Sequence, residues 1–96
     1  MIVRIVKMKF KHEHIEEFQK LFVELYPVIS TFEGCNHLSL LQDVADPGSM
    51  MTYSIWKNEE SLNRYRFSEF FKQTRSRTKV LFDDRPMAIS LHKLYP

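Results

Sequence analysis

The sequence predicts an α+β protein of the ferredoxin-like class, a split βαβ arrangement with the order strand, helix, strand, strand, helix, strand. Two observations carry this prediction. Apolar residues alternate with a period of two in four short segments, and they recur every three or four positions in two longer segments. In addition, a turn signal at Asp46, Pro47 and Gly48 joins the two middle strands into a hairpin. We therefore expect a four-stranded antiparallel sheet with both helices on one face.

Length and composition limit the classes of protein to consider. The chain has 96 residues, 44% of them hydrophobic and 27% charged, which predicts a single folded domain over residues 1–96. A formal net charge of +2 is too small to indicate a nucleic-acid or membrane-surface partner. One cysteine, Cys35, excludes an internal disulfide and multi-cysteine zinc patterns. With no leader and no apolar run of about 20 residues, we expect a cytoplasmic protein without a membrane partner.

The opening segment, MIVRIVKMKF, is apolar on both sides, which is typical of a strand covered on both faces. Arg4 is the unusual residue in it. An arginine in such a strand must find an acceptor, because an unpaired buried charge is costly. Two destinations remain open, a contact across a dimer and a position inside a pocket.

The first predicted helix lies within HEHIEEFQKLFVELYPVISTF. Its apolar stripe has helical spacing throughout and consists of Ile15, Phe18, Phe22, Leu25, Ile29 and Phe32. Pro27 removes a backbone donor inside this stripe, so it predicts a kink or a split, and the continuing stripe favours the kink. Gly34 supplies the stop signal.

The second half of the chain predicts strands over 37–43 and 50–57, two helical segments, and a last strand from Met87 to about His92. Asn58 is positioned to cap the helix that follows the hairpin. Ser68 marks a break between a shorter and a longer helix. Asp83 to Pro86 end the second helical segment.

One face of the predicted sheet has no helix to cover it. By alternation, we expect this open face to carry Leu41, Trp56 and His92 among small residues, namely Ser39, Ser54, Ala88 and Ser90. Such a face is too apolar to stay in water as a continuous patch. We therefore predict a homodimer in which the open faces of two sheets pack together.

Basic residues are concentrated in the second helical region. Six of the 14 basic residues lie between Arg64 and Lys79, namely Arg64, Arg66, Lys72, Arg75, Arg77 and Lys79. Our first interpretation is a solvated helix face. The alternative is a phosphate-bearing or carboxylate ligand near Arg75.

Several motifs together resemble the antibiotic biosynthesis monooxygenase family, small dimeric α+β barrel proteins. These motifs are EGC at 33–35, the DPG turn, the strand end YSIWKN, and EESLNRYRFSEFF after it. The resemblance covers nearly the whole chain. It implies a homodimer of ferredoxin-like subunits, each with a pocket between helices and sheet.

The resemblance also implies an activity class. Members include oxygenases that oxidise aromatic polyketides or quinols without metal or flavin, and relatives that degrade haem. Many members have Glu where this chain has Ser54, and His where it has Tyr65. The haem-degrading relatives use an Asn on the first strand, which this chain lacks, a Trp at the position of Tyr65 and an iron-binding His at the position of Arg75. The resemblance therefore argues against haem.

Metal-free oxygenation needs an apolar pocket that holds the substrate anion and a cation or donor that stabilises developing charge. We predict Tyr65 and Arg75 as catalytic residues. The predicted substrate-binding residues are Trp56, Tyr53, Phe70, Arg4, His37 and His92. Structural interpretations compete with these roles: Trp56 as a wedge between hairpin and helix, Tyr65 as core, and His37 and His92 as dimer contacts.

The sequence thus leads to a cofactor-free monooxygenase of small aromatic or quinol substrates, with no metal and no cofactor. The alternative is a non-catalytic dimeric module that binds a small ligand or serves in stress. A haem-degrading enzyme is third.

Overall fold

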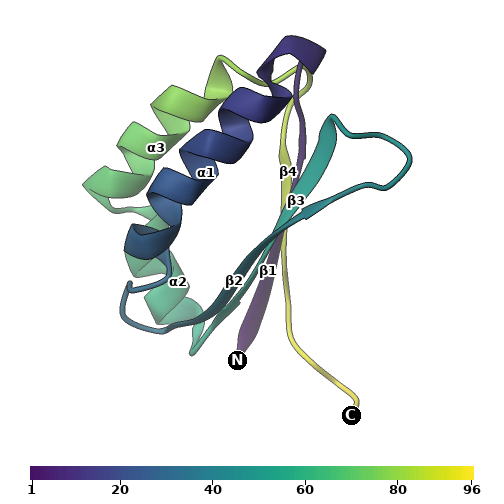
Figure 1. Ribbon diagram of the computed structural model, residues 1–96. Helices are drawn as coiled ribbons and strands as arrows, with labels where there is room; N and C mark the ends of the chain where they lie inside the picture. Colours follow the sequence, from purple (N-terminus) through teal and green to yellow (C-terminus); the bar gives the residue numbers. More distant parts are fainter.

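The computed structural model describes residues 1–96 and has the predicted architecture, a four-stranded antiparallel sheet with all its helices on one face (Figure 1). The strands are β1 (Ile2–Lys9), β2 (Cys35–Gln42), β3 (Ser49–Trp56) and β4 (Met87–Leu91). Their order across the sheet is β2-β3-β1-β4, so β1 and β3 are central. The ferredoxin-like prediction is confirmed.

The helices are α1 (Ile15–Ile29), α2 (Glu59–Arg66) and α3 (Glu69–Lys79), and a 3₁₀ turn over His12–His14 precedes α1. Both predicted starts in the second half are confirmed. The Asn58 side chain accepts a hydrogen bond from the backbone N–H of Ser61 at 2.8 Å, and the Ser68 hydroxyl accepts one from Phe71 at 3.1 Å. No helix combines the length and the apolar character that a membrane span requires.

Helix α1 passes through Pro27 and ends at Ile29, so the proline lies in its last turn. There it removes a single backbone donor close to the point where the helix stops. The Thr31 hydroxyl donates to the carbonyls of Pro27 and Val28, at 2.8 and 3.0 Å, and so satisfies carbonyls that the helix end leaves free. Gly34 adopts a φ of 89°, the left-handed conformation that glycine favours, in the turn before β2.

The hydrophobic core lies between α1 and the sheet. Its buried members are Met8, Phe10, Phe18, Phe22, Leu25, Ile29, Leu38, Met50 and Leu81. Phe10 stacks on Phe18 with ring centroids 4.1 Å apart. The predicted stripe of α1 therefore faces the sheet, although its last member, Phe32, lies beyond the helix end.

The two faces of the sheet differ from the prediction. In the ladders, Arg4 pairs with Ser54 and with Ser90, and Ser54 pairs with Leu38. Residues directly opposite on antiparallel strands share a face, and Leu38 belongs to the core under the helices. Arg4, Ser54 and Ser90 therefore lie on the helix-covered face.

The prediction that Trp56, Ser54, Ala88 and Ser90 lie on the open face is thus wrong. His92 is exposed and follows the end of β4, so it is not part of the sheet either. Leu41 and Ser39 are on the open face as predicted. The error arose because both faces of β3 and β4 alternate equally well, and only the register with β2 decides which face meets the helices.

The open face is more apolar than predicted. The registers place on it Val3, Ile5, Lys7, His37, Ser39, Leu41, Met51, Tyr53, Ile55, Met87, Ile89 and Leu91. Nine of these twelve side chains are aliphatic, methionine or tyrosine. No helix of this chain covers them (Figure 1).

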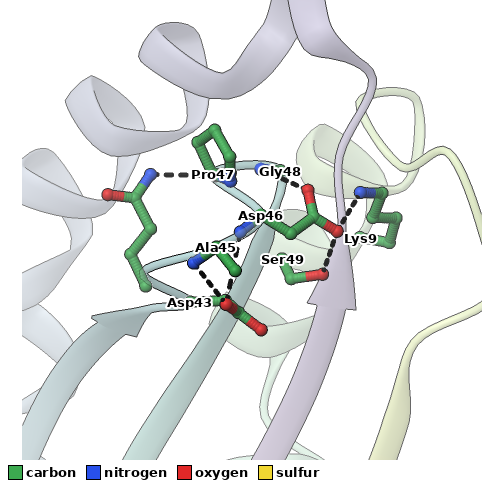
Figure 2. Close-up of polar contacts among 8 residues, drawn as sticks. Lys9, Asp43, Ala45, Asp46, Pro47, Gly48 and Ser49 are labelled. Carbon is green, nitrogen blue, oxygen red and sulfur yellow. Dashed lines mark hydrogen bonds and ion pairs between the residues drawn. The ribbon is translucent and has the colours of Figure 1, made fainter.

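The β2–β3 hairpin ends in a loop that is held by its own acidic residues (Figure 2). The Asp46 carboxylate accepts hydrogen bonds from the Lys9 ammonium, the Ser49 hydroxyl and the Gly48 backbone N–H. Asp43 accepts from the backbone N–H groups of Ala45 and Asp46. These contacts keep the pKa of Asp46 below its ordinary value, chiefly through the hydrogen bond from Lys9.

Candidate functional site

A groove of about 920 Å³ lies between the helices and the helix-covered face of the sheet. Its floor comes from β1, β3 and β4, and its walls come from all three helices and the segment before β4. The floor residues Thr52, Ser54 and Ala88 are small. Because small side chains leave volume unfilled between two layers, they are the local reason for the groove.

Three aromatic rings form one wall of the groove. Tyr65 of α2 stacks on Trp56 with ring centroids 5.1 Å apart and an interplanar angle of 22°. Phe71 of α3 meets Tyr65 edge-on, also at 5.1 Å. All three rings line the groove, so an aromatic ligand would find stacking surfaces there.

Trp56 is only 1% exposed, and its indole N–H donates to the Ser54 hydroxyl at 3.0 Å. The Ser54 hydroxyl in turn lies 3.4 Å from the carbonyl oxygen of Arg4, to which it donates. The indole donor is therefore satisfied within the protein. Because Tyr65 stacks on its ring, Trp56 supports the Tyr65 side chain and serves as the wedge between hairpin and helix.

Tyr65 is the aromatic residue of the wall with a polar group to offer. Burial raises the pKa of its phenol far above the ordinary value, and the neighbouring Cys35 adds to the shift. The phenol therefore stays protonated at neutral pH. In this state it can donate a hydrogen bond to a substrate oxygen, and it is not a base.

Cationic side chains line the same groove, and Arg4, Arg66 and Arg75 are among them. The Arg4 guanidinium donates to the Ser90 hydroxyl at 2.8 Å. Of the two destinations that the sequence left open for Arg4, the structure of the single chain gives the pocket. Cations at this place can stabilise an anionic substrate or the charge that develops on it.

The groove therefore brings together four of the eight predicted site residues: Arg4, Trp56, Tyr65 and Arg75. The other four lie outside its lining. Tyr53 and His37 contact each other on the open face, with ring centroids 5.5 Å apart. Phe70 packs against Phe32 at 5.9 Å. His92 lies beyond the end of β4.

Two groove residues were missed from the sequence, Arg66 and Phe71. Phe71 was passed over for its neighbour Phe70, because the break at Ser68 changes the helical phase between α2 and α3. Arg66 was included in a basic run interpreted as a solvated face. The sequence feature that could have identified Arg66 is its position directly after Tyr65 at the end of α2, where a side chain can point toward the sheet.

A metal centre has little support among the protein's own side chains. No group of three or more His, Cys, Asp or Glu residues is placed to hold a metal ion. The positions that the haem-degrading relatives use, here Tyr65 and Arg75, both line the groove.

The geometry defines a class: a ferredoxin-like domain with an aromatic, cation-lined groove between helices and sheet. The model of the antibiotic biosynthesis monooxygenase family matches residues 1–77. The chain therefore belongs to this monooxygenase family. No curated protein matches the sequence significantly.

Solved structures show the same fold over nearly the whole chain. An antibiotic biosynthesis monooxygenase structure is similar with a TM-score of 0.90 and 19% identity, covering 99% of this chain and 100% of that one. A conserved protein from Methanosarcina mazei has a TM-score of 0.90 and 25% identity, covering 98% of this chain and 94% of its own. Rv0793 from Mycobacterium tuberculosis has a TM-score of 0.89 and 14% identity, covering 99% and 96%.

Proposed function

We propose that the protein is a cofactor-independent monooxygenase of small aromatic or quinol substrates, which bind in the groove. The observation that carries the proposal is the union, in one groove, of the Tyr65 and Phe71 rings, a neutral phenol donor and arginines without carboxylate partners. Membership in the monooxygenase family supports it. The aromatic wall binds the substrate ring, and the Tyr65 phenol and the arginines contact the substrate oxygen on which charge develops.

The proposed reaction needs no reductant other than the substrate. A phenolic or quinol substrate binds as its anion, having lost one proton to water, and the carbon that reacts still carries a hydrogen. The anion transfers an electron to O₂, and the two radicals combine to a peroxide. Protonation and loss of water then leave a carbonyl, so one oxygen atom enters the product and the other leaves as water.

The groove residues have distinct parts in this reaction. Arg75 and Arg4 favour the anionic form of the substrate and offset negative charge as it moves onto oxygen. Tyr65 donates a hydrogen bond to the substrate oxygen, since its phenol remains protonated. We propose Tyr65 and Arg75 as the catalytic residues, with Phe71 as a ring-binding surface and Trp56 as the buried support of the Tyr65 ring.

Oxygen uptake tests the proposal. The purified, metal-stripped protein is assayed with a panel of reduced quinols and polyphenols, as wild type, Tyr65→Phe and Arg75→Ala. Arg77→Ala is the matched control, because Arg77 pairs with Glu24 at 2.7 Å outside the groove. We expect uptake above the uncatalysed rate, a loss of about 10- to 100-fold in the two site variants, and none in the control.

A second function is a small-ligand-binding module without catalysis. Ser54 and Tyr65 support it, because they replace the Glu and His that many family members have. A ligand would then raise the melting temperature while no oxygen is consumed. Absence of uptake across the panel, in a protein shown to be folded, would favour this module over the oxygenase.

We also propose that the protein is a homodimer through the open face of the sheet. Met87 is 65% exposed, Leu91 48% and Ile89 47%, and they lie opposite Lys7, Val3 and Ile5 of β1 on the same face. A continuous apolar face of this kind on a single chain is typical of an interface. A second copy with the same face is complementary to it under two-fold symmetry.

A further inference from the structure

The six arginines of the chain fall into two groups according to their place. Arg64 pairs with Glu60 and Glu33, at 3.1 and 3.4 Å, and Arg77 pairs with Glu24. Both lie outside the groove. The four arginines that line the groove are Arg4, Arg66, Arg75 and Arg85, and none of their guanidinium groups lies within 4.0 Å of a carboxylate oxygen.

The strand neighbours of Arg4 are neutral. It lies in β1 between Ser54 of β3 and Ser90 of β4, and its side-chain hydrogen bond goes to the Ser90 hydroxyl at 2.8 Å. A serine hydroxyl does not compensate a positive charge. The guanidinium therefore keeps donors for a ligand, because it carries five N–H groups in all.

Arg66, like Arg4, is a half-buried arginine of the groove. It is the last residue of α2, and its side chain donates to the Asn63 amide oxygen at 3.3 Å and lies 5.6 Å from the centre of the Phe67 ring. These partners are also neutral. Arg66 also acts on Arg4 through its positive charge. The pKa of Arg4 is lowered, chiefly by burial and secondly by this charge.

Two like charges near each other without a counterion destabilise the empty groove, and a bound anion removes that cost. Over the whole groove, the four arginines, Lys72 and Lys79 face two carboxylates, Asp83 and Asp84. The remaining lining is largely apolar, with Phe22, Leu25 and Ile29 of α1 opposite the floor. The groove is therefore both cationic and hydrophobic.

We propose that the groove binds a small aromatic anion, whose carboxylate or phosphate group is shared by Arg4 and Arg66 while its ring lies against Tyr65 and Phe71. This inference deepens the proposed function, on which it rests for the position of the site, by assigning the substrate class. Guanidinium groups suit both head groups because their N–H donors match two oxygens at once.

Calorimetric titration with three naphthalene compounds tests the proposal. These are naphthoate, naphthyl phosphate and the neutral naphthamide, and the proteins are wild type, Arg4→Gln, Arg66→Gln and Arg64→Gln. We expect at least one anion to bind the wild type about 10-fold or more tightly than the amide, the margin that charge-assisted hydrogen bonds supply. The better of the two anions identifies the head group.

The variants locate the preference. Arg4→Gln and Arg66→Gln should each remove most of the preference for the anion and leave amide binding unchanged, which also shows that the groove remains folded. Arg64→Gln should retain the wild-type preference, since Arg64 is paired outside the groove. Equal binding of anion and amide, no binding of any of the three, or a preference that survives in both groove variants would overturn the proposal.

The binding assay needs no oxygen, so it separates this inference from the proposed activity. Selective anion binding without oxygen uptake on any bound phenolic acid would leave the anion site standing and overturn the oxygenase. Oxygen uptake on neutral quinols, without any preference for anions, would support the oxygenase and overturn the anion site.

Discussion

The two faces of the sheet have different characters. The face under the helices carries Arg4, Thr52, Ser54, Ala88 and Ser90 beside the groove, whereas the open face carries valine, isoleucine, leucine, methionine and tyrosine. In most two-layer proteins the covered face is the apolar one. Here the covered face does hold the core residues Met8, Leu38 and Met50, but it is small and polar beside the groove, and the open face is apolar as well.

This difference between the faces explains both proposals about the protein. Small residues on the covered face leave a groove, and the unpaired arginines in it suit a charged ligand. Apolar residues on the open face favour contact with another surface, and we propose a second copy there. Under the two proposals, one face of the sheet binds a ligand and the other a partner, and four measurements test this contrast.

The largest effect is expected on the open face. Ile89→Lys places one unpaired charge per copy inside the proposed interface, at a cost of several kcal/mol. We expect the variant to sediment as a monomer at concentrations where the wild type is a dimer. Val44→Lys, on the exposed β2–β3 loop, is the control and should remain dimeric. A wild type that is already monomeric, or an unchanged Ile89→Lys dimer, would contradict the interface.

On the covered face, Ser54→Ala removes the acceptor of the buried Trp56 indole N–H. A buried donor without a partner costs about 1–3 kcal/mol of unfolding free energy, which urea denaturation measures. The control on the open face is Ser39→Ala, whose hydroxyl contacts His37. Both variants are made in the Ile89→Lys background, in which no second copy covers the open face, and we expect a much smaller loss for Ser39→Ala because water can replace the contact. Equal losses in the two variants would remove this distinction between the faces.

Tyr65 makes the covered face sensitive to alkali. Its pKa is raised in the folded protein, so its contribution to stability is complete below the unfolded value of 10.0 and is lost as the pH rises above it. We expect the unfolding free energy of the wild type to fall above this pH more steeply than that of Tyr65→Phe. Parallel pH profiles would show that the phenol is not buried as described.

The smallest effect is expected at the β2–β3 loop, which belongs to neither face and serves as the reference. The pKa of Asp46 is depressed, so its contribution to stability is present above the unfolded value of 3.8 and is lost as the pH falls through the folded value. Asp46→Asn should flatten the acid branch of the stability profile. The control is Glu13→Gln, at an exposed residue without an ion pair, which should follow the wild type. Identical profiles for all three proteins would show that the loop contacts contribute nothing.

Much of the fold followed from local patterns. The spacing of Phe18, Phe22, Leu25 and Ile29 predicted α1 and the side that it buries. Asn58 and Ser68 predicted two helix starts, because their side chains satisfy backbone N–H groups that lie close in the chain. Such interactions are local, so the sequence alone expresses them.

The site was only half predicted. Arg4, Trp56, Tyr65 and Arg75 were selected for chemistry and lie together, but Tyr53 and His37 lie on the other face of the sheet. Phe70 was predicted to line the site but Phe71 does so, because helical phase is lost across the turn at Ser68. Each of these wrong assignments concerns the direction in which a side chain points. They occur after the break at Ser68 or within an alternating strand, where consecutive residues point to opposite faces.

By itself, the sequence determined the class of fold, the order of its elements and the helix starts, because periodicity, caps and turns act over a few residues. Its motifs, through their resemblance to known members, indicated the family. Only the tertiary structure decided which face of β3 and β4 meets the helices, and with it the composition of the groove and the open face. The physical reason is that a strand alternates equally on both sides. The pairing of Ser54 with Leu38 and Arg4, residues far apart in the chain, breaks that tie.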